Sequence, residues 1–185
     1  MRLVCCSIIV MSLALTIASE AEVNLDNAVG IWLLDEGVGQ VAKDSSANGN
    51  DGELIKKPKW VDGKLGKSLE FDGTNYINCG HDESFNLTDE ISIIAWAKMK
   101  DPTIAKDFAG GTSIGAVNRE IGIGAHFIEN WGQYFTGLLD DVAFFDVMLT
   151  AADIKGVMNK GLKTSLAVSS TGKLTTSWGG LKTQY

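Results

Sequence analysis

Residues 135–145 read Phe-Thr-Gly-Leu-Leu-Asp-Asp-Val-Ala-Phe-Phe, and residues 29–34 read Val-Gly-Ile-Trp-Leu-Leu. In both stretches, apolar side chains occupy both sets of alternating positions. A strand that is buried on its two faces has this composition, because successive side chains point to opposite sides of a sheet. We therefore expect a strand at 29–34, and a long strand or a bent pair around Gly137 at 134–145.

Further segments with a period of two lie between these stretches. Residues 68–71 and 76–79 flank the turn-rich link Asp72-Gly-Thr-Asn75, and we expect them to form a hairpin. Residues 91–97 predict another strand, with Ile91, Ile93 and Ala95 on one face. This alternation is typical of an all-β protein.

A short helix is predicted at 151–160. Thr150 is a good N-cap, and Asp153 follows it at the spacing of a capping box. Gly161 is a good stop signal. Between these signals Ile154, Val157 and Met158 share one face, so we expect the helix to pack beside the sheets.

Six blocks of the chain, taken in order, resemble a laminin-G-like domain, which belongs to the concanavalin-A-like lectin/glucanase group. The blocks are residues 30–37, 44–52, 71–73, 91–98, 135–145 and 149–154. The resemblance implies an antiparallel two-sheet jelly-roll sandwich over residues 22–161. It also implies a domain that binds glycans or other surface ligands.

The central part of the chain is shorter than this resemblance implies. Residues 101–111 lead directly to 114–126, where members of the family usually have further hairpins. Loss of central strands would expose backbone groups and apolar faces at a sheet edge. Three explanations stay open: a reduced but folded sandwich, a sheet completed by a second chain, or a deleted remnant.

The two ends of the chain are predicted to lie outside this domain. Residues 1–21 have Arg2, a long apolar run and the small-residue pattern Ser19-Glu-Ala21, which together predict a secretory signal peptide. An uncleaved anchor is the alternative, because the apolar run is long. We expect an exported protein, extracellular or periplasmic, with no membrane span after cleavage. Residues 162–185 predict a hairpin or a tail.

The formal net charge of −7 argues against a nucleic-acid partner and favours a bound cation. Cys5 and Cys6 lie in the predicted signal peptide, which leaves Cys79 as the one cysteine of the mature chain. A lone thiol forms no internal disulfide. The sequence does not indicate an oligomeric state.

The segment Asp44-Ser-Ser-Ala-Asn-Gly-Asn-Asp-Gly52 predicts a structural calcium site. Ca²⁺ prefers six to eight oxygen ligands on a tightly turned loop. By the resemblance, this loop lies near the acidic pair of the late strand. The implied ligands are Asp44, Asn48, Asn50 and one of Asp140 or Asp141. The alternative interpretation is that these residues simply form good turns.

Aromatic side chains are candidates for stacking against sugar rings, which have an apolar side. Three lie in glycine-rich or polar segments and are the predicted ligand-binding residues: Trp131, Tyr134 and Trp178. Three others lie in apolar segments and are expected in the core: Trp32, Trp60 and Trp96.

The sequence does not predict an enzyme. Glycosidases of similar fold place paired acids on one strand as Glu-x-Asp-x-x-Glu, and we find no such motif. The adjacent acidic pairs would point to opposite faces of a strand; they are Asp35-Glu36, Asp89-Glu90 and Asp140-Asp141. His81 and His126 have no recognisable catalytic partner, and Cys79 is expected to pack as a small apolar residue. We therefore predict a secreted binding module for a carbohydrate or cell-surface ligand. The alternatives are a structural protein that completes its sheet with another chain, or a truncated remnant without a ligand site.

Overall fold

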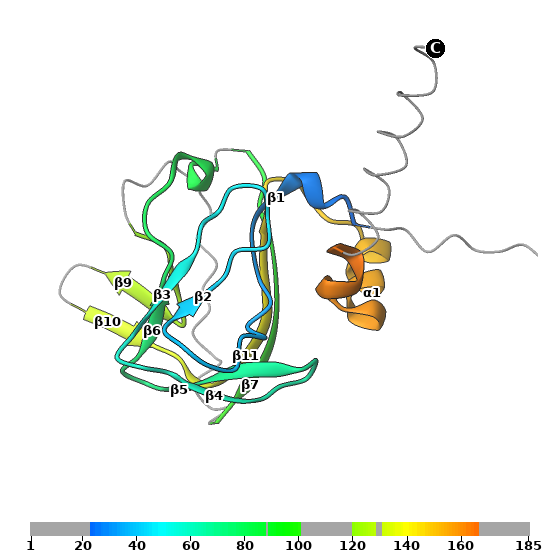
Figure 1. The fold of residues 1–185 in the computed structure, drawn as a ribbon. Coiled ribbons are helices and arrows are strands. Elements are labelled where there is room, and N and C mark those ends of the chain that lie inside the picture. The colour runs from blue at the N-terminus through cyan, green and yellow to red at the C-terminus, as the bar shows by residue number, and fades with distance from the viewer. Residues whose placement is uncertain (1–22, 88, 101–119, 129–130, 167–185) are drawn as a thin grey trace, which may run out of the picture.

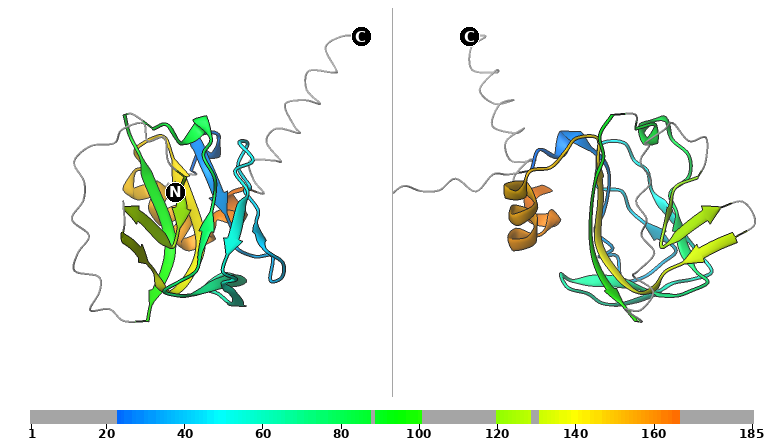
Figure 2. Two further views of the ribbon diagram at one scale, coloured as in Figure 1. Left: turned by 90° about the vertical axis from the view of Figure 1, so that its left-hand side faces the viewer. Right: turned by 180° about the vertical axis from the view of Figure 1, so that it is seen from behind.

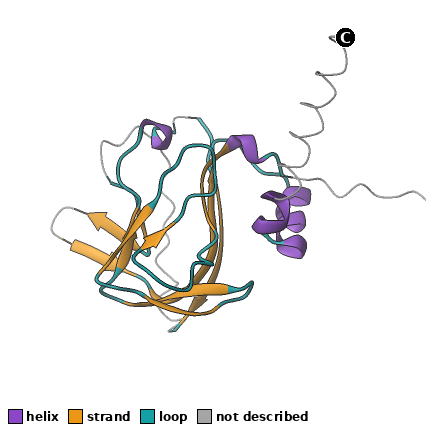
Figure 3. Cartoon of the chain, viewed as in Figure 1, coloured by secondary structure: helices purple, strands orange, loops and turns teal. Residues whose placement is uncertain are grey.

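The computed structural model describes residues 23–87, 89–100, 120–128 and 131–166. Strands form two antiparallel sheets and a separate two-stranded hairpin, and helix α1 (Ala151–Lys160) lies beside them (Figures 1 and 3). Short 3₁₀ turns occur at Leu25–Asn27 and Glu83–Phe85. The prediction of an all-β sandwich is confirmed at this level.

The larger sheet is built around β11 (Thr136–Phe145), the longest strand. Strand β7 (Ser92–Met99) pairs along nearly all of one side of β11. On the other side, β5 (Lys67–Asp72) pairs with the first half of β11 and β1 (Ala28–Trp32) with the second half. Strand β4 (Lys59–Asp62) then pairs with β5 as a hairpin.

Strand β11 bends within its length. The register with β7 shifts between Asp140 and Ala143, and Asp141 has a positive φ of 48°. This is a β-bulge, which bends the strand and changes the face to which later side chains point. The predicted break near Gly137 falls instead at Phe135, between β10 and β11.

The smaller sheet has the order β2 (Val41–Ala42), β3 (Gly52–Ile55), β6 (Tyr76–Asn78), β8 (Gly122–Ile123). Strands β9 (Ala125–Ile128) and β10 (Trp131–Tyr134) form the separate hairpin. The predicted hairpin of 68–71 with 76–79 is wrong, because β5 and β6 belong to different sheets. The link between them crosses from one sheet to the other.

Two apolar clusters hold these layers together. The first fills the space between the sheets around Trp32, Leu69 and Phe71, all of them buried. The second lies between the outer face of the larger sheet and α1, where Phe145 and Val157 are buried (Figures 1 and 2). Cys79 is buried in the first cluster, and burial raises the pKa of its thiol to about 12.

Helix α1 has the predicted bounds and caps. The Thr150 hydroxyl accepts the Asp153 N–H, and the Asp153 carboxylate accepts the Thr150 N–H, which completes the capping box. After Gly161, residues 162–166 are helical; the remainder of the predicted C-terminal hairpin or tail lies outside the described residues. The predicted signal peptide also lies outside them. No helix of the described chain is long and apolar enough to cross a membrane.

Candidate ligand-binding site

A row of four side chains crosses the outer face of the larger sheet. The strand register places Lys59 opposite Glu70, Glu70 opposite Leu138, and Leu138 opposite Lys98. The row therefore begins on β4, passes over β5 and β11, and ends on β7. Three strand spacings separate its ends, which corresponds to about 14 Å between the backbones of the two lysines.

A second, parallel row lies two residues further along the strands. Asp72 pairs with Thr136, and the Lys100 N–H donates to the Thr136 carbonyl oxygen. Lys57, two residues before Lys59, lies on the β4 side of this row. The first row thus has a lysine at both ends, the second ends at Lys100, and successive residues on one face of a strand lie about 7 Å apart.

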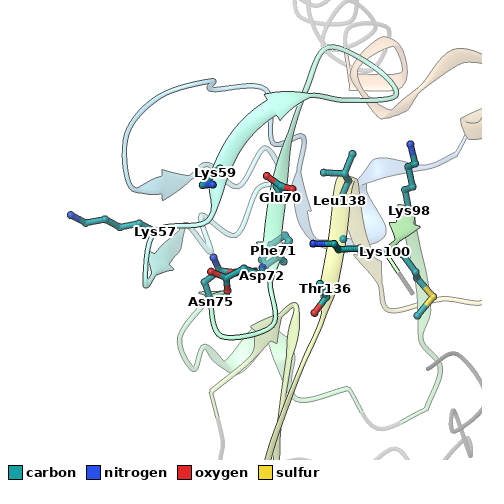
Figure 4. Close-up of a pocket in the computed structure, with 12 residues that line it drawn as sticks. Lys57, Lys59, Glu70, Phe71, Asp72, Asn75, Lys98, Lys100, Thr136 and Leu138 are labelled. Atoms are coloured by element: carbon teal, nitrogen blue, oxygen red, sulfur yellow. The ribbon is translucent and has the colours of Figure 1, made fainter. Parts of the chain in front are cut away.

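The two rows line a groove of about 450 Å³ (Figure 4). Glu70 and Asp72 are exposed on its floor, whereas Leu69 and Phe71, at the intervening positions of β5, are buried in the core. Figure 4 shows Lys59 and Lys98 on opposite sides of Glu70; Lys57 extends outward from the rim. The groove carries four lysines and two carboxylates, a formal charge of +2 in a chain of −7.

Gly137 lies in the middle of the groove floor. It has a positive φ of 147°, and a Cβ atom there would lie 2.2 Å from the Lys98 carbonyl oxygen. Only glycine therefore allows β11 and β7 to approach so closely at this point. The shape of the groove floor depends on this residue.

Two tyrosines follow or precede groove-lining residues along the chain, although neither of them lines the groove. The ring centroids of Tyr76 and Tyr134 are 6.0 Å apart, and the Lys56 Nζ lies 5.8 Å from the Tyr134 centroid. These three residues are one or two positions along the chain from the groove residues Asn75, Thr136 and Lys57. Tyr134 is 36% exposed. The assignment of Tyr134 as a ligand-binding residue stays a prediction.

Lys56 and Lys57 have positive φ angles of 57° and 55°. The left-handed region is unfavourable for residues other than glycine, asparagine and aspartate. The turn between β3 and β4 is therefore strained where it holds Lys56 over Tyr134 and Lys57 at the groove. Backbone strain of this kind is commonly found at binding sites.

The predicted calcium loop is held together by its own hydrogen bonds. One Asp44 carboxylate oxygen accepts the backbone N–H groups of Ile31 and Ser46; the other accepts the Ser46 hydroxyl and the Asn50 N–H. A carboxylate has about four lone-pair positions, so these donors occupy all of them. In this geometry Asp44 has no lone pair left for a cation.

Asn48 and Asn50 also serve to hold the loop. Both side-chain amides donate to the Val29 carbonyl oxygen, and the Asn50 amide donates to the Ser84 hydroxyl as well. The structure thus favours the alternative interpretation of this segment, a turn closed by its own asparagine and aspartate residues.

The structure does not bring Asp140 and Asp141 to this loop. Asp44 bridges to Trp32 of β1, and Trp32 pairs on its other side with Val142 of β11. About two strand spacings, roughly 10 Å, therefore separate the Asp44 backbone from β11. The structure therefore does not bring together all the residues of the ligand set that the resemblance implies. Within the described residues, no three His, Cys, Asp or Glu side chains form a group that could hold a metal ion.

Asp140 and Asp141 instead hold two loops against the sheet. The Asp140 carboxylate accepts the backbone N–H groups of Lys64 and Leu65 in the β4–β5 turn. The Asp141 carboxylate accepts the Leu162 N–H after α1. Burial raises the pKa of Asp141 to about 6, and the nearby charges of Asp140 and Asp35 add to this effect.

The other predicted aromatic residues divide as follows. Trp32 is fully buried, as expected, but Trp60 and Trp96 are only half-buried. Trp96 lies on the outer face of β7, with the Lys64 Nζ 5.5 Å from its ring. Trp131 belongs to β10, although its side chain is outside the described part, and Trp178 lies outside the described residues altogether.

The lysine groove was missed by the sequence-based reasoning. The sequence contains two lysine pairs at a spacing of two residues, Lys57-Pro-Lys59 and Lys98-Met-Lys100. The floor pair Glu70-Phe-Asp72 has the same spacing. Neither pattern tells which strands are neighbours, so the groove follows only from the register.

Comparison of the chain with protein-family models, curated proteins and solved structures finds no match. The laminin-G resemblance therefore stays a prediction, and the function has to be argued from the site itself.

Proposed function

We propose that this protein is an exported, non-enzymatic binding module for a carbohydrate or cell-surface ligand, built on a shortened laminin-G-like jelly roll. The observation that carries the proposal is the open groove lined with polar groups, together with the 36% exposed Tyr134, which lies two residues before the groove residue Thr136. A sugar ring has an apolar side that stacks on aromatic faces and a rim of hydroxyls that needs hydrogen-bond partners. The groove supplies hydrogen-bond partners, and Tyr134 supplies an aromatic side chain that a ligand is able to reach.

The two carboxylates in the groove are able to accept hydrogen bonds from a ligand. Glu70 and Asp72 are two residues apart on β5 and point to the same face of the sheet. Hydrogen bonds from the Thr74 side chain and backbone hold the pKa of Asp72 below its ordinary value. Asp72 is thus an ionised acceptor for ligand hydroxyls.

Affinity electrophoresis in gels that contain neutral or acidic polysaccharides tests the proposal. We expect retardation by at least one polysaccharide, and we expect Tyr134→Ala to weaken it. Tyr134→Phe is the matched control, because it keeps the ring and should keep the binding. Equal binding by Tyr134→Ala, or the release of new reducing ends from the polysaccharide, would contradict the proposal.

A second candidate function is the completion of the sheet by another copy of the chain. Among the described strands, β7 pairs only with β11. Its inner-face residue Ile93 is 60% exposed, and the neighbouring Ile91 is 37% exposed. An edge strand with exposed apolar side chains is able to pair with a second chain.

Light scattering after size-exclusion chromatography tests this candidate. If two copies associate through β7, Ile93→Lys should convert a dimer to a monomer, because a charge on an edge strand opposes pairing. Val38→Lys, at a position that is 76% exposed away from β7, is the control. A wild-type monomer across the concentration range would exclude the candidate.

A further inference from the structure

We infer that the lysine groove binds an acidic saccharide, whose anionic groups contact the lysines at the two sides and whose hydroxyls contact the floor. The inference rests on the proposed function, which it deepens by naming the class of ligand. It starts from the cross-strand row that has Lys59 and Lys98 at its ends, and from the parallel row that ends at Lys100, with Lys57 also lining the groove.

The groove lysines are available to a ligand. None of the four forms a salt bridge within the described part of the chain, although Lys59 lies directly opposite Glu70. Other exposed lysines do have such partners: Lys43 pairs with Asp51, and Lys163 with Asp35. A group of unpaired cations on an acidic protein creates a local positive field that attracts anions.

The spacing favours an extended ligand with separated charges. About 14 Å lies between the lysine-bearing strands β4 and β7, and about 7 Å between the two rows. A single small anion would contact one side only. A chain that carries an anionic group on successive rings is able to reach lysines on both sides.

The floor distinguishes a saccharide from other polyanions. The carboxylates of Glu70 and Asp72 lie between the lysines, where they accept hydrogen bonds and repel anionic groups. A sugar offers hydroxyl donors at that point, and hydrogen bonds to a charged acceptor are the stronger kind. A polyphosphate has no such donors. Tyr134, two residues before the groove residue Thr136, is a further candidate contact for a sugar ring.

The test compares ligands that differ in charge alone. Polygalacturonate and its methyl ester share one backbone, as do dextran sulfate and dextran. We expect affinity electrophoresis to show that polygalacturonate binds more strongly than its ester, or that dextran sulfate binds more strongly than dextran. A difference within the first pair identifies carboxylate as the anionic group of the ligand, and a difference within the second pair identifies sulfate. Binding should weaken as salt is added, because exposed charges are screened.

The variant Lys59→Gln/Lys98→Gln removes one lysine from each side. We expect it to weaken binding of the acidic polymer about tenfold, at the scale of two exposed charge contacts. Lys43→Gln/Lys155→Gln changes the net charge equally at exposed positions outside the groove and should bind as the wild type does. A matching loss in this control would show a nonspecific charge effect and overturn the inference.

The failure of the inference can be told from failure of the proposed function. Suppose that the protein binds the ester and the neutral dextran, and that this binding is lost in Tyr134→Ala but unaffected in the double-lysine variant. This result would overturn the assignment of an acidic ligand and would keep carbohydrate binding as the function. Absence of binding to all four polymers would overturn both. A single-stranded oligonucleotide that binds more tightly than the polysaccharides would also overturn the inference.

Discussion

The indole N–H of Trp32 donates a 2.9 Å hydrogen bond to the backbone carbonyl oxygen of Asn50. Trp32 is the largest fully buried side chain among the residues that the structure describes, and this bond satisfies its one polar group. The Asp44 loop is therefore joined to the core between the sheets, and its shape and the packing of Trp32 depend on each other.

Asp44→Ala should destabilise the protein strongly. The change removes the acceptor for the N–H groups of Ile31, Ser46 and Asn50, and unpaired donors are costly when they are shielded from water. We expect the free energy of unfolding, measured in urea, to fall by about 3 kcal/mol. Ser45→Ala changes an exposed residue of the same loop and should have little effect; equal losses would contradict the role of Asp44.

Calcium should not stabilise the protein. The four donors around the Asp44 carboxylate leave no lone pair for an ion. We expect the same Tm with excess Ca²⁺ and with chelator. A bound ion at about 100 times its Kd would add roughly 2.7 kcal/mol, so an upward shift of Tm in calcium would be easily seen and would restore the predicted site.

Asp141→Asn should stabilise the protein at pH 7.5. The pKa of Asp141 is about 6 in the folded state, raised from 3.8 chiefly by burial. As the pH rises, the unfolded state therefore loses this proton first, and stability falls between pH 4 and 6. The free energy of unfolding falls by up to about 3 kcal/mol over this range, because each unit of difference between the folded and unfolded pKa is worth 1.36 kcal/mol.

Asparagine keeps an acceptor for the Leu162 N–H but carries no charge. Urea unfolding from pH 4 to 8 should show that Asp141→Asn gains stability over the wild type as the pH rises, with little difference at pH 4. Asp146→Asn, at an exposed position, is the control. A variant that is less stable than the wild type at pH 7.5 would show that the charge of Asp141 is favourable.

Lys57→Gly should stabilise the turn between β3 and β4. The positive φ of Lys57 costs about 1–2 kcal/mol in a lysine and nothing in glycine, which offsets the greater flexibility of glycine in the unfolded chain. We expect a net gain of about 1 kcal/mol. Lys59→Gly, in β4, should instead lose about 1 kcal/mol. If both changes destabilise the protein equally, the turn is not strained.

The parts of this protein that depend on near neighbours in the chain were predicted well. Helix α1 was expected at its observed bounds, because the capping box of Thr150 with Asp153 and the stop at Gly161 act within a few residues. The strand at β1 was expected because alternation is also a local property. The Asp44 segment was correctly seen as a tight loop, although its function was assigned from the resemblance.

Strand pairing and the site could not be derived in this way. Residues 68–71 and 76–79 have the pattern of a hairpin, yet the turn between them carries the chain from one sheet to the other. The strands that β5 and β6 pair with are decided by the burial of Leu69 and Ile77, which lie on the facing sides of the two sheets. The distance between Asp44 and Asp140 depends on the same pairing.

The sequence by itself therefore determined that the chain forms strands with one capped helix, and it contains the lysine pairs Lys57 with Lys59 and Lys98 with Lys100. Only the tertiary structure decided that these pairs lie at opposite sides of one groove. The reason is physical: alternation within a strand sets the face of each side chain, whereas the register between β4, β5, β11 and β7 is set by packing between residues far apart in the chain.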